Sequence, residues 1–186
     1  FLDGIMIRTF EQAEVEALAE YGSIPIINGL TDFCHPCQVL ADLMTVREHK
    51  GHLDGLKMVY IGDGNNMANS LIVGGLKMGM DVAVACPENF DPDKKVLDFA
   101  KDDKGFGLYR DPIEACAGAD VIFTDVWASM GQEGEAEERR NVLYPVLVET
   151  KGPNPIEFEN GYVAFEDLPD DKKKDPDDED FDDFDD

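Results

Sequence analysis

The chain has 186 residues, of which 43% are hydrophobic, so it can bury the core of one domain and part of a second. Its formal net charge of -25 disfavours nucleic acid as a partner, because phosphates attract Lys and Arg. No stretch approaches the roughly 18 apolar residues of a membrane span, and no basic-then-apolar leader opens the sequence. We therefore expect a soluble, cytoplasmic protein with reduced thiols and no membrane or nucleic-acid partner.

Alternating apolar segments predict two strands and two helices in the first fifty residues. They are a strand over residues 2–7, a helix over 10–21, a strand over 24–28 and a helix from Pro36 to about Lys50. Each helix has an expected apolar face: Val15, Leu18 and Ala19 on the first, and Val39, Leu40, Leu43 and Met44 on the second. Because the chain opens at Phe1 in an apolar run, we expect its start to be cut from something longer.

Two cysteines flank a histidine in TDFCHPCQVLAD, at the turn from the second strand into the second helix. A zinc site needs two further ligands at a compatible spacing, and His49 and His52 lie at and just past the far end of the predicted helix, so no metal site is expected. A thioredoxin-type redox pair also follows a strand and opens a helix. Cys34 and Cys37 therefore leave a redox function open at this point.

Strands and helices continue to alternate beyond Gly51. Strands are predicted over residues 56–62, 81–87 and 120–127, and helices over 66–78, 91–103 and 111–119. This alternation predicts an α/β fold with a doubly wound parallel sheet, in which ligands bind at the carboxyl ends of the strands. The glycine-rich break at 51–55 suggests the domain division 1–50, 51–150 and 151–186.

The segment IGDGNNMANS follows the first of these strands. Its Gly62 and Gly64 suggest a dinucleotide-binding turn, but Met67 stands where that fingerprint requires a small residue. Asn65 and Asn66 lie at a helix N-terminus, where they could grip a zwitterionic small molecule or merely cap the helix.

A second polar loop, TDVWASMGQE, follows the last predicted strand. Asp125 could hold an ammonium group there, and Ser129 could bond to either end of an amino acid. In an isolated loop the same residues would be ordinary turn chemistry.

The residues after 165 are strongly acidic, with thirteen acidic side chains and three lysines from Glu166 to Asp186. Such a segment cannot bury enough apolar surface to fold, so we expect a disordered tail. Its two phenylalanines could dock on a basic partner.

Several segments in a fixed order resemble the ornithine carbamoyltransferases. They are GIMIRTF, IPIINGLTD, HPCQVLADLMTVREH, IGDGNNMANS, GLKMGMDVAVACP and DVWASMGQE, and the resemblance runs from Phe1 to about Tyr144. It implies that residues 1–50 are the last part of a carbamoyl-phosphate-binding α/β domain with a bridging helix, and that 51–150 form a Rossmann-like ornithine-binding domain. The implied reaction is carbamoyl transfer from carbamoyl phosphate to ornithine, giving citrulline and phosphate in arginine biosynthesis.

The resemblance also implies roles for individual residues. Arg8 and His35 match positions that bind carbamoyl phosphate and catalyse, since both can donate to the carbonyl oxygen where negative charge develops. Gln38 matches the position that orients the carbamoyl amide. The positions that hold ornithine are matched by Asn66, Asp125, Ser129 and Met130. No metal or organic cofactor is implied, and the assembly implied is a homo-oligomer, typically a trimer.

Two family sequences do not occur in the chain: the phosphate-gripping Ser-Thr-Arg-Thr loop and the His-Cys-Leu-Pro loop. We therefore expect a truncated or rearranged ornithine carbamoyltransferase without appreciable activity alone. One alternative is a non-enzymatic interaction protein that reuses the α/β core and makes contact through the acidic tail. Another is a nucleotide-dependent oxidoreductase or a redox protein built on the two closely spaced cysteines.

Overall fold

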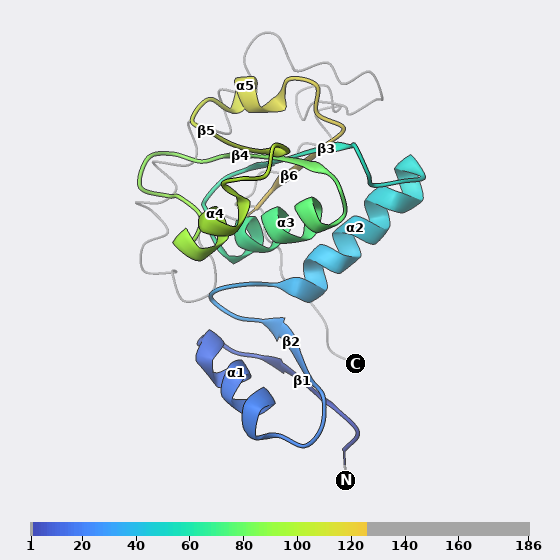
Figure 1. The fold of residues 1–186 in the computed structure, drawn as a ribbon, viewed down its shortest axis with the longest axis vertical. Coiled ribbons are helices and arrows are strands. Elements are labelled where there is room, and N and C mark those ends of the chain that lie inside the picture. Colours follow the sequence, from blue (N-terminus) through green and yellow to red (C-terminus); the bar gives the residue numbers. More distant parts are fainter. Residues whose placement is uncertain (1, 126–186) are drawn as a thin grey trace, which may run out of the picture. The chain divides into compact units, whose positions relative to one another are not determined.

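The structure is a computed structural model that describes residues 2–125, all of which fall in one compact unit of the chain. It is an α/β fold whose described strand pairs are all parallel, so the predicted fold class is confirmed (Figure 1). The elements in chain order are β1 (Ile5–Arg8), α1 (Gln12–Tyr21), β2 (Ile26–Leu30), α2 (Pro36–Lys50), β3 (Lys57–Ile61), α3 (Asn66–Lys77), β4 (Asp81–Ala85), α4 (Lys94–Ala100), β5 (Phe106–Tyr109), α5 (Pro112–Cys116) and β6 (Val121–Thr124).

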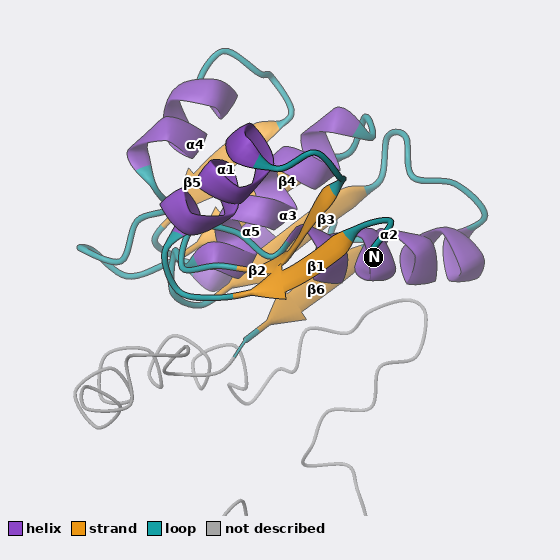
Figure 2. Ribbon diagram, turned by 90° about the horizontal axis from the view of Figure 1, so that it is seen from below, coloured by secondary structure: helices purple, strands orange, loops and turns teal. Residues whose placement is uncertain are grey.

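The strands form two sheets. β1 and β2 make a two-stranded parallel sheet in which Met6 pairs with Ile27, and the two strands lie side by side in Figure 2. The other sheet has the order β5-β4-β3-β6. The chain therefore adds β4 and β5 on one side of β3 and later returns to place β6 on the other side. Such a reversal leaves a crevice at the carboxyl ends of the two strands beside it.

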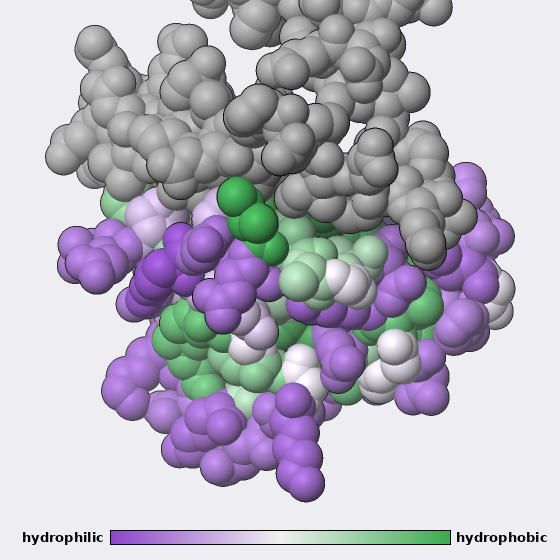
Figure 3. All heavy atoms as spheres, turned by 90° about the horizontal axis from the view of Figure 1, so that it is seen from above, coloured by the Kyte–Doolittle hydropathy of each residue, from purple (hydrophilic) through white to green (hydrophobic). Residues whose placement is uncertain are grey.

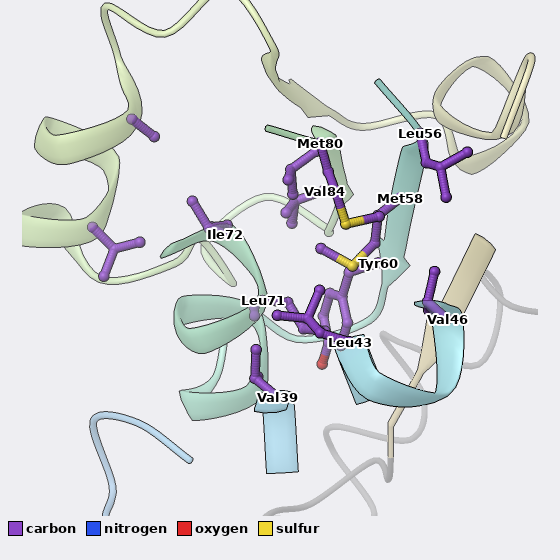
Figure 4. Packing of buried hydrophobic residues seen from close by; sticks show 14 of the residues in the cluster. Val39, Leu43, Val46, Leu56, Met58, Tyr60, Leu71, Ile72, Met80 and Val84 are labelled. Atoms are coloured by element: carbon purple, nitrogen blue, oxygen red, sulfur yellow. The ribbon is translucent and has the colours of Figure 1, made fainter. Parts of the chain in front are cut away.

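The central strands β3 and β4 are buried along almost their whole length, as expected of a parallel sheet that is covered on both faces. Figure 1 shows α3 and α4 on one face of this sheet and α5 on the other. In the core, Met58 and Tyr60 of β3 point toward Leu43 of α2 and Leu71 of α3 (Figure 4). Helix α2 therefore packs on the same core as the four-stranded sheet.

Helix α2 has the predicted bounds for identifiable reasons. Pro36 occupies its first turn, where the missing N–H costs nothing, and Gly51 ends it in the left-handed conformation with φ 82°. Its predicted apolar face is partly wrong, because Leu40 and Met44 are 57% and 55% exposed. The helix turns Val39, Leu43 and Val46 to the core instead.

Several other expectations needed correction. The elements β1, α4 and α5 are shorter than predicted, at Ile5–Arg8, Lys94–Ala100 and Pro112–Cys116. Strand β5 was not predicted, because its short run is interrupted by Gly107 and lacks a clear strand pattern. On α1 only Val15 is buried, while Leu18 is 38% exposed. Strand β2 begins two residues later than predicted, after Pro25, whose ring removes a ladder donor. The expected acidic tail and the last residues of the final predicted strand lie outside the described residues.

A seam of buried polar side chains ties the loop between β2 and α2 to the first turns of α3. Asn66 Nδ2 donates to the Thr31 carbonyl at 2.9 Å, and Asn69 Nδ2 donates to the Phe33 carbonyl at 2.9 Å. Ser70 Oγ accepts the backbone N–H of His35 at 2.8 Å. Because these groups are shielded from water, each hydrogen bond would be costly to leave unmade. The seam therefore fixes the backbone around His35.

Hydrophilic residues dominate the described part of the face in Figure 3, with smaller hydrophobic areas between them. Within residues 2–125, no helix combines the length and the apolar character that crossing a membrane requires.

Replacing Asn69 with Ala is expected to lower the free energy of unfolding by about 1–3 kcal/mol, because two backbone groups lose their hydrogen bonds to this buried residue. Those partners are the Phe33 carbonyl and the Asp93 N–H, which donates to Asn69 Oδ1 at 2.9 Å. Urea unfolding measures the change. The control is Thr45→Ala, which removes an exposed hydrogen bond within α2 and should change stability by less than about 0.5 kcal/mol. If both variants lowered the free energy of unfolding equally, the claim that the hydrogen bonds of Asn69 stabilise this part of the fold would be wrong.

Candidate functional site

A cleft with a volume of about 350 Å³ lies at the carboxyl ends of β3 and β6, where Ile61 and Thr124 pair across the reversal in strand order. Polar and apolar side chains both line it. The polar ones are Arg8, His35, Gln38, Asp42, Asn66, Thr124 and Asp125, and the apolar or aromatic ones are Leu30, Tyr60, Met67, Leu71 and Phe123. Ligands of α/β sheets bind at such a position, so this cleft is the candidate site.

Five of the seven residues singled out from the sequence line this one cleft. Arg8 comes from the end of β1, His35 and Gln38 from the start of α2, Asn66 from the first turn of α3 and Asp125 from the end of β6. They are far apart in the sequence, and the fold brings them to one place. Ser129 and Met130 lie outside the described residues.

His35 stands just before α2, but its side chain makes no capping hydrogen bond to the helix. Its Nδ1 atom is buried and has no hydrogen-bond partner in the part of the chain that the structure describes. Burial lowers the pKa of His35, and so does the charge of Arg8, while Asp42 and Asp125 act in the opposite direction. The imidazole is therefore held toward its neutral form, which has one N–H to donate and one nitrogen to accept.

Asn65, which the sequence analysis treated as either a ligand or a cap, is the N-cap of α3 and also reaches across to the last strand. Its Oδ1 accepts from the backbone N–H groups of Met67 and Ala68, and the Tyr60 hydroxyl donates to the same oxygen at 3.2 Å. With its oxygen engaged in this way, its Nδ2 donates to Asp125 Oδ2 at 2.9 Å. Burial raises the pKa of Tyr60, so the hydroxyl stays protonated and remains a donor. This chain of hydrogen bonds orients the Asp125 carboxylate.

Asn66 is 9% exposed, and its Nδ2 donates to the Thr31 carbonyl. The residue therefore both lines the cleft and belongs to the polar seam.

The glycine-rich turn before α3 is packed by the chain itself. A Cβ on Gly64 would lie 2.2 Å from the Pro92 backbone nitrogen, and Gly64 N–H donates to the Phe90 carbonyl at 2.8 Å. Arg110 braces the same loop from β5, with NH2 2.6 Å from Asp91 Oδ1 and NH1 3.0 Å from the Cys86 carbonyl. Gly64 thus permits close contact with the loop after β4, which accounts for the glycine without a dinucleotide.

The two closely spaced cysteines have no features of a reactive pair. Cys34 and Cys37 are half-buried free thiols, and burial raises the pKa of Cys34, whereas redox thiols have lowered values. Within residues 2–125, no group of three or more His, Cys, Asp or Glu side chains is placed to hold a metal ion.

The cleft offers two kinds of polar group to a small ligand. Arg8 and His35 can donate to a carbonyl or phosphoryl oxygen, and the oriented Asp125 carboxylate can accept from an ammonium group. The apolar side chains that line the cleft can pack against an aliphatic chain. The sequence pattern offered no signal for Tyr60, which reads as a core residue of β3. Asp42, by contrast, could have been found from its spacing, since it lies one helical turn after Gln38.

Comparison with known proteins gives matches over most of the chain. The family model of the aspartate/ornithine carbamoyltransferase carbamoyl-P binding domain matches residues 1–48, and that of the Asp/Orn binding domain matches residues 54–155. The ornithine carbamoyltransferase of Thermococcus kodakarensis is 54% identical over 153 residues, which are 80% of this chain and 49% of that protein.

Solved structures agree with these sequence matches. The ornithine carbamoyltransferase from Pyrococcus furiosus has a TM-score of 0.72 at 53% identity, covering 78% of this chain and 48% of the other. The anabolic ornithine carbamoyltransferase from Campylobacter jejuni has a TM-score of 0.73 at 33% identity, covering 77% and 50%. The chain thus spans about half the length of the curated relatives it matches. Because the two family models together cover most of its residues, this chain belongs to the aspartate/ornithine carbamoyltransferase family.

Proposed function

We propose that this chain carries part of an ornithine carbamoyltransferase active site, which transfers a carbamoyl group from carbamoyl phosphate to ornithine and releases citrulline and phosphate. The observation that carries the proposal is the convergence of Arg8, His35 and Gln38 with Asp125 on one cleft. The names of the two matched domains, carbamoyl-P binding and Asp/Orn binding, agree with a cleft that receives both substrates.

Each side of the cleft has a distinct task in this reaction. Arg8 and a neutral His35 donate hydrogen bonds to the carbamoyl carbonyl oxygen, where negative charge accumulates as the amine attacks. Gln38 orients the carbamoyl amide. Asp125 holds the α-ammonium group of ornithine, and Asn66, Ser129 and Met130 complete the binding of this amino acid. Holding the side-chain amine of ornithine close to the carbonyl carbon accelerates the reaction by proximity. No metal or organic cofactor takes part.

The proposal also includes the homotrimer that the family resemblance implies and a location in the cytoplasm. The relatives described above are all named as ornithine carbamoyltransferases, and none of them supports the alternative of a non-enzymatic interaction protein.

We expect ligand binding rather than robust turnover from this chain alone. Arg8 is the one lysine or arginine among the described lining residues, and the sequence contains neither a Ser-Thr-Arg-Thr nor a His-Cys-Leu-Pro segment. One guanidinium neutralises only part of the charge of a bound phosphate.

His35→Ala is expected to weaken carbamoyl phosphate binding by roughly tenfold, because the cleft loses a donor to the carbonyl oxygen. The ligand-dependent rise in melting temperature measures this, since a bound ligand stabilises the native state by mass action. The control is the double variant Cys34→Ala with Cys37→Ala, which should keep most of the response. If the cysteine variant lost the response and His35→Ala kept it, the assignment of His35 would be wrong.

Asp125→Asn is expected to weaken ornithine binding by roughly tenfold or more, because the ammonium group loses its charged partner. The response to carbamoyl phosphate should be largely unchanged. Isothermal titration calorimetry with ornithine measures the affinity. Asp102→Asn changes an exposed carboxylate outside the cleft by the same single charge, so it controls for the altered net charge. If both variants lost the same affinity for ornithine, the loss would come from the changed net charge of the protein and not from the loss of Asp125 in the cleft.

The lowered pKa of His35 predicts a pH dependence of stability. The unfolded chain binds a proton on this histidine more readily than the folded chain does, so stability is fully present above the unfolded pKa of about 6.5 and falls as the pH drops through it. His35→Gln should therefore lose less stability than the wild type between pH 7 and pH 5. Urea unfolding at the two pH values measures the difference, and identical losses would exclude the effect.

A further inference from the structure

Gln38 and Asp42 form a hydrogen-bonded pair on the face of α2 that lines the cleft. Gln38 Nε2 donates to Asp42 Oδ1 at 2.8 Å, and the two residues lie four apart, one helical turn from each other. Within residues 2–125 this is the one hydrogen bond of the Gln38 side chain. Both side chains are among those that line the cleft.

A carboxylate determines the orientation of a neighbouring side-chain amide. Asp42 in its ionised form has only acceptor oxygens, so it attracts the amide nitrogen of Gln38 and repels the amide oxygen. The opposite orientation would place two oxygens against each other. The bond to Asp42 therefore keeps Nε2 on its own side and leaves Gln38 Oε1 as the acceptor that a ligand meets.

A carbamoyl group requires this orientation. Its nitrogen carries two hydrogens and needs an acceptor, and the amide nitrogen of a reversed Gln38 would offer further hydrogens instead. Asp42 has a second effect on the same ligand, because its charge partly offsets the lowering of the pKa of His35 by burial and Arg8. Asp42 itself is half-buried, and the Gln38 hydrogen bond favours its charged form.

We propose that Asp42 is a positioning residue which, by fixing the amide of Gln38, lets the cleft distinguish a carbamoyl group from an acyl group of the same shape. This inference rests on the proposed function, because it assumes that carbamoyl phosphate binds in the cleft. Asp42 does not touch the reacting atoms; it acts through Gln38.

A pair of ligands tests the proposal: carbamoyl phosphate and acetyl phosphate, in which a methyl group replaces the amide nitrogen. The wild-type chain should bind carbamoyl phosphate roughly three- to tenfold more tightly than acetyl phosphate, the effect of one hydrogen bond. Asp42→Ala should bring the two affinities together by weakening carbamoyl phosphate alone. Asp42→Asn, which offers Gln38 both an acceptor and a donor, should restore part of the difference. Ligand-dependent melting temperatures over a concentration series give the affinities.

The chain contains a matched control for the loss of a glutamine–carboxylate pair. In α1, Gln12 Nε2 donates to Glu16 Oε1 at 3.3 Å with the same spacing of four residues, and neither residue lines the cleft. Glu16→Ala should leave the ratio of the two affinities unchanged.

The outcomes separate the inference from the function on which it rests. If Asp42→Ala kept the wild-type preference for carbamoyl phosphate, or if the wild type showed no preference between two ligands that both bind, the role of Asp42 would be overturned while the proposed function stood. If neither ligand raised the melting temperature of the wild-type chain, both the role of Asp42 and the proposed function would be overturned.

Discussion

The buried hydrogen bonds between α3 and the loop that precedes α2 are the constraint on which the rest of the site depends. Asn66, Asn69 and Ser70 present three side chains on one helical face, and each binds a backbone group of residues 31–35. Water cannot replace these bonds without opening the interface, so the backbone of His35 has one well-defined position. Helix α2 starts from that position, and the direction of its first turn then places Gln38 and Asp42. Through these hydrogen bonds, the position of α3 on the four-stranded sheet determines where the start of α2 lies in the cleft.

Much of the fold could be predicted because local chemistry and global packing agree there. Pro36 and Gly51 determine the ends of α2 whatever the rest of the chain does, and the apolar runs of β3 and β4 suit a doubly covered parallel sheet. Prediction failed where tertiary packing decides. Leu40 and Met44 have the spacing of a buried stripe, but the core lies on the side of Val39 and Leu43. Strand β5 is short, and it is held by pairing with β4 rather than by any pattern of its own.

The candidate site shows the same division. Arg8, His35, Gln38, Asn66 and Asp125 could be named from motifs, but their convergence on one cleft follows from the order of the strands. The residues that orient these side chains were harder to predict from the sequence. Asn65 has the sequence signature of a helix cap, and nothing local to IGDGNN indicates that its nitrogen reaches a carboxylate 60 residues later. Only the return of β6 to the side of β3 makes that contact possible.

That distance along the chain has a consequence for how the protein folds. The carboxylate of Asp125 and the amide that orients it are brought together only when β6 docks, and β6 is the last of the described strands in chain order. The loop of His35, by contrast, is held by α3, within the first part of the sheet to be synthesised. The side of the cleft that carries His35 can therefore form before Asp125 is in place. Any ligand that bridges Asp125 and the loop of His35 would bind only chains in which β6 has docked, and would therefore report on that step of folding.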